Sequence, residues 1–562
     1  MEGMNRGKYE PDDWEEFGTG SDDCFSSDYA LPHKDSSEGG CRPSKFEQLE
    51  QQKEPFSDYR QFEDLELDVF CPLLPACPNQ IAMLPEIQEE IEDIVAPKTQ
   101  NERPFSLSTL ELLKDYTKGR RRLNVEPSDA NLAGQKLSTE EIMRFAGVKF
   151  IQSSIQMAGV ASLLKYPYDL SFSGLSDEET KNGELAECML ASAEKVGNQQ
   201  YDSARRLLNQ CDLLSSNTGN PVQRVVYYFS EALRKRIDRE TGKVASQSLE
   251  SDLFDVYEAV MIPNPIIQAC YEGIPFYQVP HFAGTQAILE NMAEAKRIHV
   301  IDLKISNGLQ WTVLMHALAS RNECPLELLK ITAVGTNSKQ HIEDTGNRLK
   351  SFAQTTNIPF SFKIVMVSSM LDLKEDLFEL DADEQLAVYS EYALKSLIVQ
   401  PNQLGHLMEV LRSINPCVLV MIEIEANHNS RVFVHRFIET LFYFSAYFDC
   451  VDACLEHNDP SSRMIIESIY LGEGIRNIVA SEGEERKIRN VKIDVWRKFL
   501  AQFGMVETEL SEASLYQANF VIKKFAFGSC CTFDMDGKSL LIGWKGTPIL
   551  SLSTWKFMPQ VS

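Results

Sequence analysis

The sequence lacks the segments that would mark a secreted or membrane protein. Residues Met1 to Glu10 contain no apolar stretch, so we expect no signal peptide. No apolar run approaches the about 18 residues that cross a bilayer, so we expect no membrane contact. The thirteen cysteines are an odd number and include no C-x-x-C pair. We therefore expect reduced thiols, as in a cytosolic or nuclear protein, and no metal site.

Basic residues are also scarce. The chain has 82 Asp and Glu against 55 Lys and Arg, a formal net charge of -27. Residues 1–100 hold 24 acids and 8 bases, a net charge of 8 − 24 = -16. A nucleic-acid binder normally shows a basic footprint, although a local patch on an acidic protein can still attract phosphate. Protein partners are therefore a better first expectation than naked DNA.

The chain has 562 residues, and 43% of them are hydrophobic. This length predicts one large domain with a tail, or two to three domains. Residues 1–135 form an acidic region rich in Ser, Pro and Gly with isolated aromatics, and we expect it to be disordered. Two interpretations stay open: a solvating tail, or a segment that orders on a partner, with residues 65–74 as the best local candidate.

A compact basic cluster interrupts this region, and its members are Lys118, Arg120, Arg121 and Arg122. Nuclear import receptors read such runs, but similar runs also occur as solvated loops. The cluster is our candidate for a nuclear import signal.

Residues 180–295 read mainly as helices. Ser138 and Glu141 form a capping-box pattern at the start of an earlier helix. Apolar residues then recur at helical spacing over 185–196, 204–211 and 222–237. For most of these leucine-rich positions core packing is the stronger interpretation.

From residue 296 onward, short apolar strands alternate with helices. The expected strands cover residues 298–301, 329–334, 360–367, 386–389 and 417–422. This alternation predicts right-handed βαβ units and a mostly parallel sheet. Asp536-Gly537 lies between two further apolar runs and predicts an antiparallel hairpin. We therefore predict an α/β, Rossmann-like fold, of the class I methyltransferase type, with a C-terminal antiparallel hairpin and an α-helical cap subdomain.

One motif follows the first expected strand, and it consists of Ile298, His299, Val300, Ile301, Asp302, Asn307, Gly308, Gln310 and Trp311. This motif resembles the V-H-I-I-D signature and the N/Q-G-x-Q-W continuation of the plant GRAS family. Further blocks agree in order: a leucine-rich region over residues 185–236, Leu404, Leu407 and Leu411 of a second leucine-rich region, the run Glu423, Glu425, Ala426, Asn427, His428 and Asn429, and Ser553-Thr554-Trp555 of the S-A-W block.

The resemblance implies a GRAS domain over residues 180–560. Its helical cap and first leucine-rich region take residues 180–295. Its α/β core, with the V-H-I-I-D, second leucine-rich, P-F-Y-R-E and S-A-W blocks, takes residues 296–562. Arg431, Glu473 and Gly474 depart from the proline, arginine and glutamate of the P-F-Y-R-E block. The D-E-L-L-A and V-H-Y-N-P segments of gibberellin-responsive members are missing.

The same resemblance implies a function. GRAS proteins act in the nucleus as transcriptional regulators or coregulators, and a cytoplasmic pool is compatible with that. They join DNA-binding transcription factors, such as zinc-finger proteins, and pair with themselves or with other GRAS proteins. Some members are reported to touch DNA directly.

The loop after the first strand does not suit a cofactor. Dinucleotide and adenosylmethionine sites place glycines here, because the backbone must approach the ligand. This loop has only Gly308, with bulky Leu303 and Ile305 before it. We therefore predict no cofactor and no enzyme activity. Asp302 is interpreted as a carboxylate that caps backbone N–H groups, with a residual ligand contact as the alternative.

Glu423 and Glu425 alternate on one strand and could form an acid pair, but hydrogen bonding at the rim of the sheet is the preferred interpretation. His299 and His428 are interpreted as structural. The competing functions are an adenosylmethionine-dependent small-molecule methyltransferase and a cytosolic signalling adaptor.

Candidates for a partner or dimer surface are Gln223, Arg224, Tyr228, Leu404, Leu407, Leu411 and Trp555. For Gln223, Arg224 and Tyr228 the alternative is that they clasp the helical cap to the sheet. Packing is preferred for Trp544, and Trp555 is left open between packing and a partner.

Overall fold

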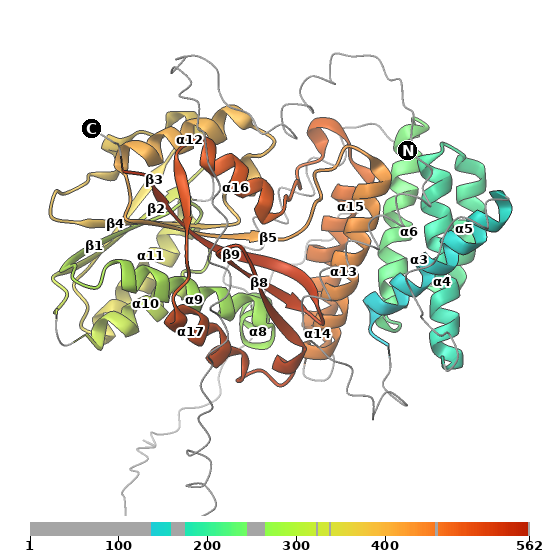
Figure 1. The fold of residues 1–562 in the computed structure, drawn as a ribbon, viewed down its shortest axis with the longest axis horizontal. Coiled ribbons are helices and arrows are strands. Elements are labelled where there is room, and N and C mark those ends of the chain that lie inside the picture. The colour runs from blue at the N-terminus through green and yellow to red at the C-terminus, as the bar shows by residue number, and fades with distance from the viewer. Residues whose placement is uncertain are drawn as a thin grey trace, which may run out of the picture. The chain divides into compact units, whose positions relative to one another are not determined.

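The computed structural model describes residues 137–158, 175–243, 265–321, 324–336, 339–455 and 459–559 (Figure 1). All of them belong to one unit of the chain, Asn79–Ser562. The predicted disordered region 1–135 and the basic cluster of Lys118, Arg120, Arg121 and Arg122 lie outside the described residues. None of the described helices combines the length and the apolar character needed to cross a membrane.

A mixed sheet forms the centre of the described chain. Its strands are β1 (Arg297–Asp302), β2 (Leu328–Gly335), β3 (Phe360–Met366), β4 (Gln385–Glu391), β5 (Val418–Ile424), β6 (Met505–Thr508), β7 (Cys531–Asp536), β8 (Ser539–Trp544) and β9 (Thr547–Phe557). They lie in the order β3-β2-β1-β4-β5-β9-β8-β7, and β6 also pairs with β9. The first five are parallel, which confirms the predicted α/β class. The strand order reverses between β1 and β4.

Helices cover both faces of this sheet. The α-helices are α3 (Thr139–Ala158), α4 (Asp177–Gly197), α5 (Tyr201–Leu214), α6 (Pro221–Glu240), α8 (Pro265–Gly273), α9 (Pro275–Asn291), α10 (Leu309–Ala319), α11 (Lys339–Thr355), α12 (Pro401–Ile414), α13 (Phe433–Leu455), α14 (Pro460–Ile465), α15 (Gly472–Ala480), α16 (Ile493–Gln502) and α17 (Glu512–Ile522). A π-helix, η5 (Ile466–Leu471), joins α14 to α15, and the short 3-10 helices are η2 (Met370–Asp372), η3 (Glu375–Phe378), η4 (Leu394–Leu397), η6 (Gly483–Glu485) and η7 (Gly528–Cys530).

Side chains alternate between two hydrophobic clusters along each buried strand. On β5, Val420 belongs to the cluster under α9, α10, α11 and α17, and Met421 belongs to the cluster under α12 and α16. Strands buried on both faces have this apolar composition in both alternating sets. This explains why residues 417–422 are apolar without a polar face.

The C-terminal hairpin is present where the sequence predicts it. Strands β7 and β8 pair antiparallel, and Asp536 lies opposite Ser539 across the turn. Gly537 has a φ of 60°, the left-handed conformation that this turn requires. Strand β9 returns antiparallel beside β5 and closes that edge of the parallel strands.

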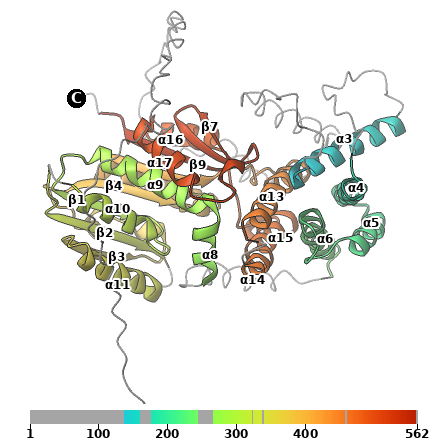
Figure 2. The same ribbon diagram turned by 90° about the horizontal axis from the view of Figure 1, so that it is seen from below.

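Helices α3 to α6 form the cap, and both views place α13 and α15 between the cap and the sheet (Figures 1 and 2). The predicted capping box at the start of α3 is present, because the Ser138 N–H donates to Glu141 Oε2 at 2.9 Å and the Glu141 N–H donates to Ser138 Oγ at 3.2 Å. Helix α6 begins at Pro221 behind a second box, formed by Asn220 and Gln223. These local signals fix where the cap helices start.

The boundaries of the helical part differ from the predicted 180–295. Helix α3 begins at Thr139 and packs on α4 and α13, so the helical part starts before residue 180. Helix α9 lies within the predicted cap range but packs on β5 and β9 of the sheet. Helices α13 and α15, from the C-terminal half, pack on α6. Helical periodicity reports which face is buried, but it does not report the partner that covers that face.

Candidate functional site

The site that the fold singles out lies beyond the carboxyl ends of β1, β4 and β5. In open α/β sheets ligands bind there, at the point where the strand order reverses. In this chain that point lies between β1 and β4. Two structures meet at this edge, the β1–α10 loop (residues 302–308) and a cavity beside it.

Asp302 ends β1 and is fully buried. Its Oδ1 accepts the Lys304 N–H at 3.0 Å, and its Oδ2 accepts the Trp311 indole N–H at 2.9 Å. Burial raises the pKa of Asp302 to about 7, although both hydrogen bonds favour the charged form. The carboxylate thus ties the loop to α10, in agreement with the capping interpretation.

Two bulky residues of the loop are buried in the fold. Leu303 and Ile305 are each 2% exposed, and they pack into the clusters on opposite faces of the sheet. Gly308 has a φ of 72°, and a Cβ at this position would lie 3.0 Å from Thr345 Cγ2. Gly308 therefore serves a left-handed helix start and leaves no open backbone facing a ligand.

The other residues of the motif also contact the fold itself. Ile298, Val300 and Ile301 are buried in β1. Their neighbours at the start of α10 are held by the loop: Asn307 Oδ1 accepts the Leu309 N–H at 3.0 Å, Gln310 Nε2 donates to Asp302 Oδ2 at 3.3 Å, and Trp311 packs edge-on against Tyr389 at 4.9 Å between ring centres.

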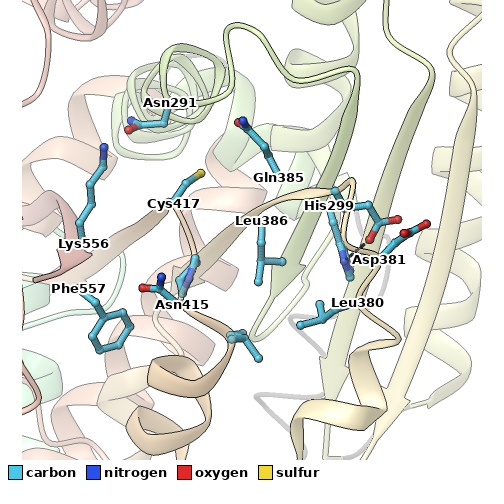
Figure 3. Close-up of a pocket in the computed structure, with 13 residues that line it drawn as sticks. Asn291, His299, Leu380, Asp381, Gln385, Leu386, Asn415, Cys417, Lys556 and Phe557 are labelled. Carbon is cyan, nitrogen blue, oxygen red and sulfur yellow. Dashed lines mark ion pairs between the residues drawn. The ribbon is translucent and has the colours of Figure 1, made fainter. Parts of the chain in front are cut away.

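His299 lies at the opposite end of β1, away from Asp302. It is fully buried, its Nε2 lies 2.8 Å from Thr332 Oγ1, and its Nδ1 lies 3.0 Å from Glu384 Oε2. Burial, followed by Lys330 and Lys363, lowers its pKa to about 3, so the ring is neutral at pH 7. Figure 3 shows His299 in the wall of a pocket at this amino-terminal edge, with Asp381 and Gln385 beside it. Both ring nitrogens of His299 thus lie beside polar groups of the fold, and its structural interpretation stays a prediction.

The cavity at the carboxyl edge was missed by the sequence analysis. It has a volume of about 300 Å³, within the size range of small-molecule sites. Residues from α9, the β1–α10 loop, the ends of β4 and β5, α13, η5 and α15 line it. They lie between positions 270 and 550 of the chain, so no local motif could have shown that they meet.

Charged groups gather at one side of this cavity. His281 Nε2 lies 3.0 Å from Glu391 Oε2, which also accepts the Tyr389 hydroxyl at 3.2 Å. Although burial alone raises the pKa of Glu391, His281 and Tyr389 outweigh it and hold the pKa below its usual value. Burial lowers the pKa of Lys395 to about 8, and it lowers the pKa of Lys304 as well.

Glu423 and Glu425 do not form an acid pair. Glu423 Oε1 accepts the Lys395 backbone N–H at 3.3 Å, whereas Glu425 Oε2 accepts the Ile493 N–H at 3.0 Å. Burial raises the pKa of each glutamate to about 7. Their separate backbone partners agree with the rim interpretation.

His428 completes the predicted polar residues and lines the cavity. Burial, followed by Lys395 and other cations, lowers its pKa to about 3, so it is neutral. Asn490 Nδ2 lies 2.8 Å from its Nδ1. Across the described ranges, no group of three His, Cys, Asp or Glu side chains has the arrangement of a metal site.

Most of the residues expected at a partner surface are buried, and for them that expectation is wrong. Leu404, Leu407 and Leu411 are fully buried under the sheet, and Trp555 is 1% exposed. The second leucine-rich region is therefore core. The same helical spacing serves a core and an interface, and the sequence alone could not separate them.

Arg224 and Tyr228 instead join the cap to the rest of the domain. Arg224 is 2% exposed, and its guanidinium lies 3.0 Å from Glu467 of η5 and 2.6 Å from Asp452 of α13. Tyr228 is 5% exposed and packs near Phe448. Gln223 completes the capping box of α6. Arg224 and Tyr228 therefore act as the clasp that was the alternative, but they hold the cap to α13 and η5 and not to the sheet, whereas Gln223 bonds within the cap, to Asn220 and Leu214.

Comparison with known proteins identifies this architecture. Residues 185–556 match the sequence profile of the GRAS domain family. The DELLA protein GAI1 of Vitis vinifera is 30% identical over 68% of this chain and 63% of its own length, and the DELLA protein RGL1 of Arabidopsis thaliana is 31% identical over 68% of this chain and 71% of its own length. The chain thus spans less than two thirds of GAI1. The crystal structure of SCL7 from Oryza sativa aligns with a TM-score of 0.54 and 25% identity, over 62% of this chain and 94% of that one. The chain belongs to the GRAS domain family.

Proposed function

We propose that this protein regulates transcription in the plant nucleus, as a regulator or coregulator that acts by contact with DNA-binding transcription factors. The observation that carries the proposal is the β1–α10 loop, where Asp302, Leu303 and Ile305 are buried in the fold. A methyltransferase of this topology needs an open glycine path at this place. Membership in the GRAS family and similarity to DELLA proteins support a regulatory role.

Contacts with other proteins, such as zinc-finger factors, explain the proposed regulation better than contacts with DNA alone. The net charge of -27 opposes phosphate over the molecule as a whole. Leu404, Leu407 and Leu411 are buried and so are not available for pairing. We therefore assign pairing of the protein with itself or with another GRAS protein to the first leucine-rich region. There Leu213 and Leu214, at the end of α5, are 84% and 59% exposed. Exposed leucines at a helix end supply an apolar contact for a second GRAS cap.

A proximity-labelling experiment with the full chain in plant cells tests this function. The tagged protein is expected in nuclei, with transcription factors among the labelled proteins. The double change Leu213→Asp with Leu214→Asp is expected to remove GRAS proteins from the labelled set. Leu371→Asp, at a leucine that is 50% exposed on the core, is the matched control. The proposal is contradicted if the tagged protein stays outside nuclei and no transcription factor is among the labelled proteins.

The candidate nuclear import signal is tested separately. Replacing Lys118, Arg120, Arg121 and Arg122 by Ala is expected to move the protein from the nucleus to the cytosol. An unchanged location means that this cluster is not the import signal. A wild-type protein that resides in the cytosol favours the signalling adaptor instead.

Calorimetry with adenosylmethionine tests the absence of methyl transfer. The filled loop predicts no micromolar binding. Micromolar binding that Asp302→Ala abolishes would restore the methyltransferase hypothesis.

A further inference from the structure

Two cysteines meet where two helices of the cap pack together. Cys188 lies on α4 and Cys211 lies on α5, about equally far along the chain from the turn at Gln199. Helices α4 and α5 contact each other and lie side by side in both views (Figures 1 and 2). A short turn joins antiparallel helices, so equal spacing from it places the two residues at the same height of the pair.

The side chain of Cys188 reaches α5 beside Cys211. Cys188 Sγ lies 3.5 Å from Leu207 O and 3.8 Å from Gln210 Oε1. In a regular α-helix the carbonyl of Leu207 receives the N–H of Cys211, so the sulfur of Cys188 lies within one turn of Cys211. The two thiols also share a hydrogen bond.

The environments of the two thiols differ. Cys211 is fully buried, whereas Cys188 is partly exposed. The hydrogen bond with Cys211 lowers the pKa of Cys188, although burial and Glu187 raise it, and the same bond raises the pKa of Cys211. Because the thiolate is the form that reacts with oxidants, Cys188 is the more reactive sulfur, and Cys211 keeps its proton.

A second pair of thiols, in the core, provides a contrast. Cys450 and Cys454 lie one turn apart on α13, both are buried, and their sulfurs are 4.0 Å apart. Burial raises the pKa of Cys450 well above its usual value. Proximity is thus common to both pairs, but Cys450 is buried with a raised pKa where Cys188 is partly exposed with a lowered one.

We propose that Cys188 and Cys211 form an oxidation site, at which hydrogen peroxide converts the two thiols into a disulfide that links α4 to α5. The Cys188 thiolate attacks one oxygen of the peroxide and the O–O bond breaks. Cys188 becomes a sulfenic acid, and the other oxygen leaves as water with the proton that Cys188 released. The Cys211 sulfur then attacks the Cys188 sulfur, the S–O bond breaks, and the hydroxyl leaves as water with the Cys211 proton. The two thiols lose two electrons, and one hydrogen peroxide is reduced to two waters.

The crosslink would hold the C-terminal half of α5 to α4. Leu213 and Leu214, the exposed leucines of α5, follow Cys211 directly in the last turn of the helix. Oxidation therefore fixes the helix end that carries the pairing surface proposed above. This consequence rests on the proposed function, whereas formation of the disulfide does not, so the chemistry can fail or succeed independently of the pairing.

The test treats the reduced full chain with hydrogen peroxide, alkylates the remaining thiols and maps disulfides by mass spectrometry after tryptic digestion. Cleavage after Lys and Arg places Cys188 in residues 182–195 and Cys211 in residues 207–224, each with a single cysteine. We expect these two peptides to become joined and dithiothreitol to separate them. Joining is expected to be at least about tenfold faster than oxidation of the Cys450–Cys454 pair, because each unit of pKa changes the thiolate fraction about tenfold.

Three variants sharpen the test. Cys211→Ser removes the second sulfur, so Cys188 should accumulate as a sulfenic acid that dimedone labels. Cys188→Ser should leave Cys211 as a thiol. Cys324→Ser, at a partly exposed cysteine outside the cap, is the control and should form the crosslink as the wild type does.

The proposal is overturned if the two peptides stay separate under peroxide, or if the Cys450–Cys454 pair is oxidised as fast. Circular dichroism monitors folding of the variants. The disulfide map of the wild-type chain decides the question if a variant does not fold.

Discussion

Two neighbouring parts of one sheet edge are built in opposite ways. The β1–α10 loop is packed with side chains, and its only carboxylate, Asp302, is used for internal hydrogen bonds. The cavity beside it keeps about 300 Å³ open, and Lys395 faces it without an ion-pair partner among the described residues. The loop is closed by packing, whereas the space beside it stays open next to Lys395. Leu303 and Ile305 of the loop are buried, while the space next to the loop has not been filled.

The largest expected effect comes from replacing Trp311, the residue of α10 that binds Asp302 of the loop. Trp311→Ala leaves a cavity against Tyr389 and removes the indole donor from Asp302, so the free energy of unfolding should fall by about 4 kcal/mol. Urea denaturation measures this change. Tyr516→Ala, at an aromatic residue of α17 that is 64% exposed, should change it by less than about 0.5 kcal/mol. Similar losses for the two variants would show that the loop is not a packed unit.

The next effect is a difference in how the free energy of unfolding depends on pH between the β1–α10 loop and the cavity. The pKa of Asp302 is raised to about 7 in the folded protein, so the stability it contributes is present below its ordinary pKa and is lost as pH rises toward 7. The stability difference between wild type and Asp302→Asn should therefore fall by about 2 kcal/mol between pH 4.5 and 7.

Glu391, on the cavity side, should behave in the opposite way. Its pKa is lowered, so its contribution is present above its ordinary pKa and is lost only as pH falls through the folded value. The difference between wild type and Glu391→Gln should stay flat from pH 4.5 to 7 and shrink below that range. Denaturant titrations across pH measure both slopes, and parallel slopes would remove the contrast.

A smaller loss is expected at the glycine of the loop. Gly308→Ala forces a left-handed alanine against Thr345 and should cost about 2 kcal/mol. Gly242→Ala, with a φ of 70° and open space around the added methyl, should cost about 1 kcal/mol. The difference between the two, measured by thermal or urea unfolding, isolates the steric closure of the loop.

The smallest change is expected in the cavity. Lys395→Met removes a buried ammonium group, and Glu423, with a pKa raised to about 7 by burial, can take up a proton to remain neutral. The free energy of unfolding should stay within about 1 kcal/mol of wild type or rise. A loss as large as that of Trp311→Ala would mean that Lys395 is a structural residue.

The sequence predicted those parts of the fold that depend on local patterns. The strand ranges, the hairpin at Gly537 and the capping box of Ser138 and Glu141 follow from periodicity and turn chemistry. The closed loop also follows, because Leu303 and Ile305 stand where a cofactor site needs glycine. The sequence also predicted that Asp302 caps backbone N–H groups, because the loop lacks the glycines of a cofactor site.

Long-range packing lay beyond those patterns. Leu404 has the same periodicity whether a sheet or a partner covers it, and only the structure shows that it belongs to the hydrophobic cluster that also contains residues of β5 and α16. Arg224 meets Glu467 across more than two hundred residues, which no spacing rule anticipates. The cavity likewise joins His281, Lys395 and Asn490 from distant segments.

By itself, then, the sequence determined the order of the strands along the chain, the family and the loss of the glycine path after β1. The tertiary structure alone decided which leucines are buried, which charges pair and where space remains. The physical reason is that backbone conformation responds to residues a few positions apart, whereas burial and ion pairing depend on what the rest of the chain brings alongside.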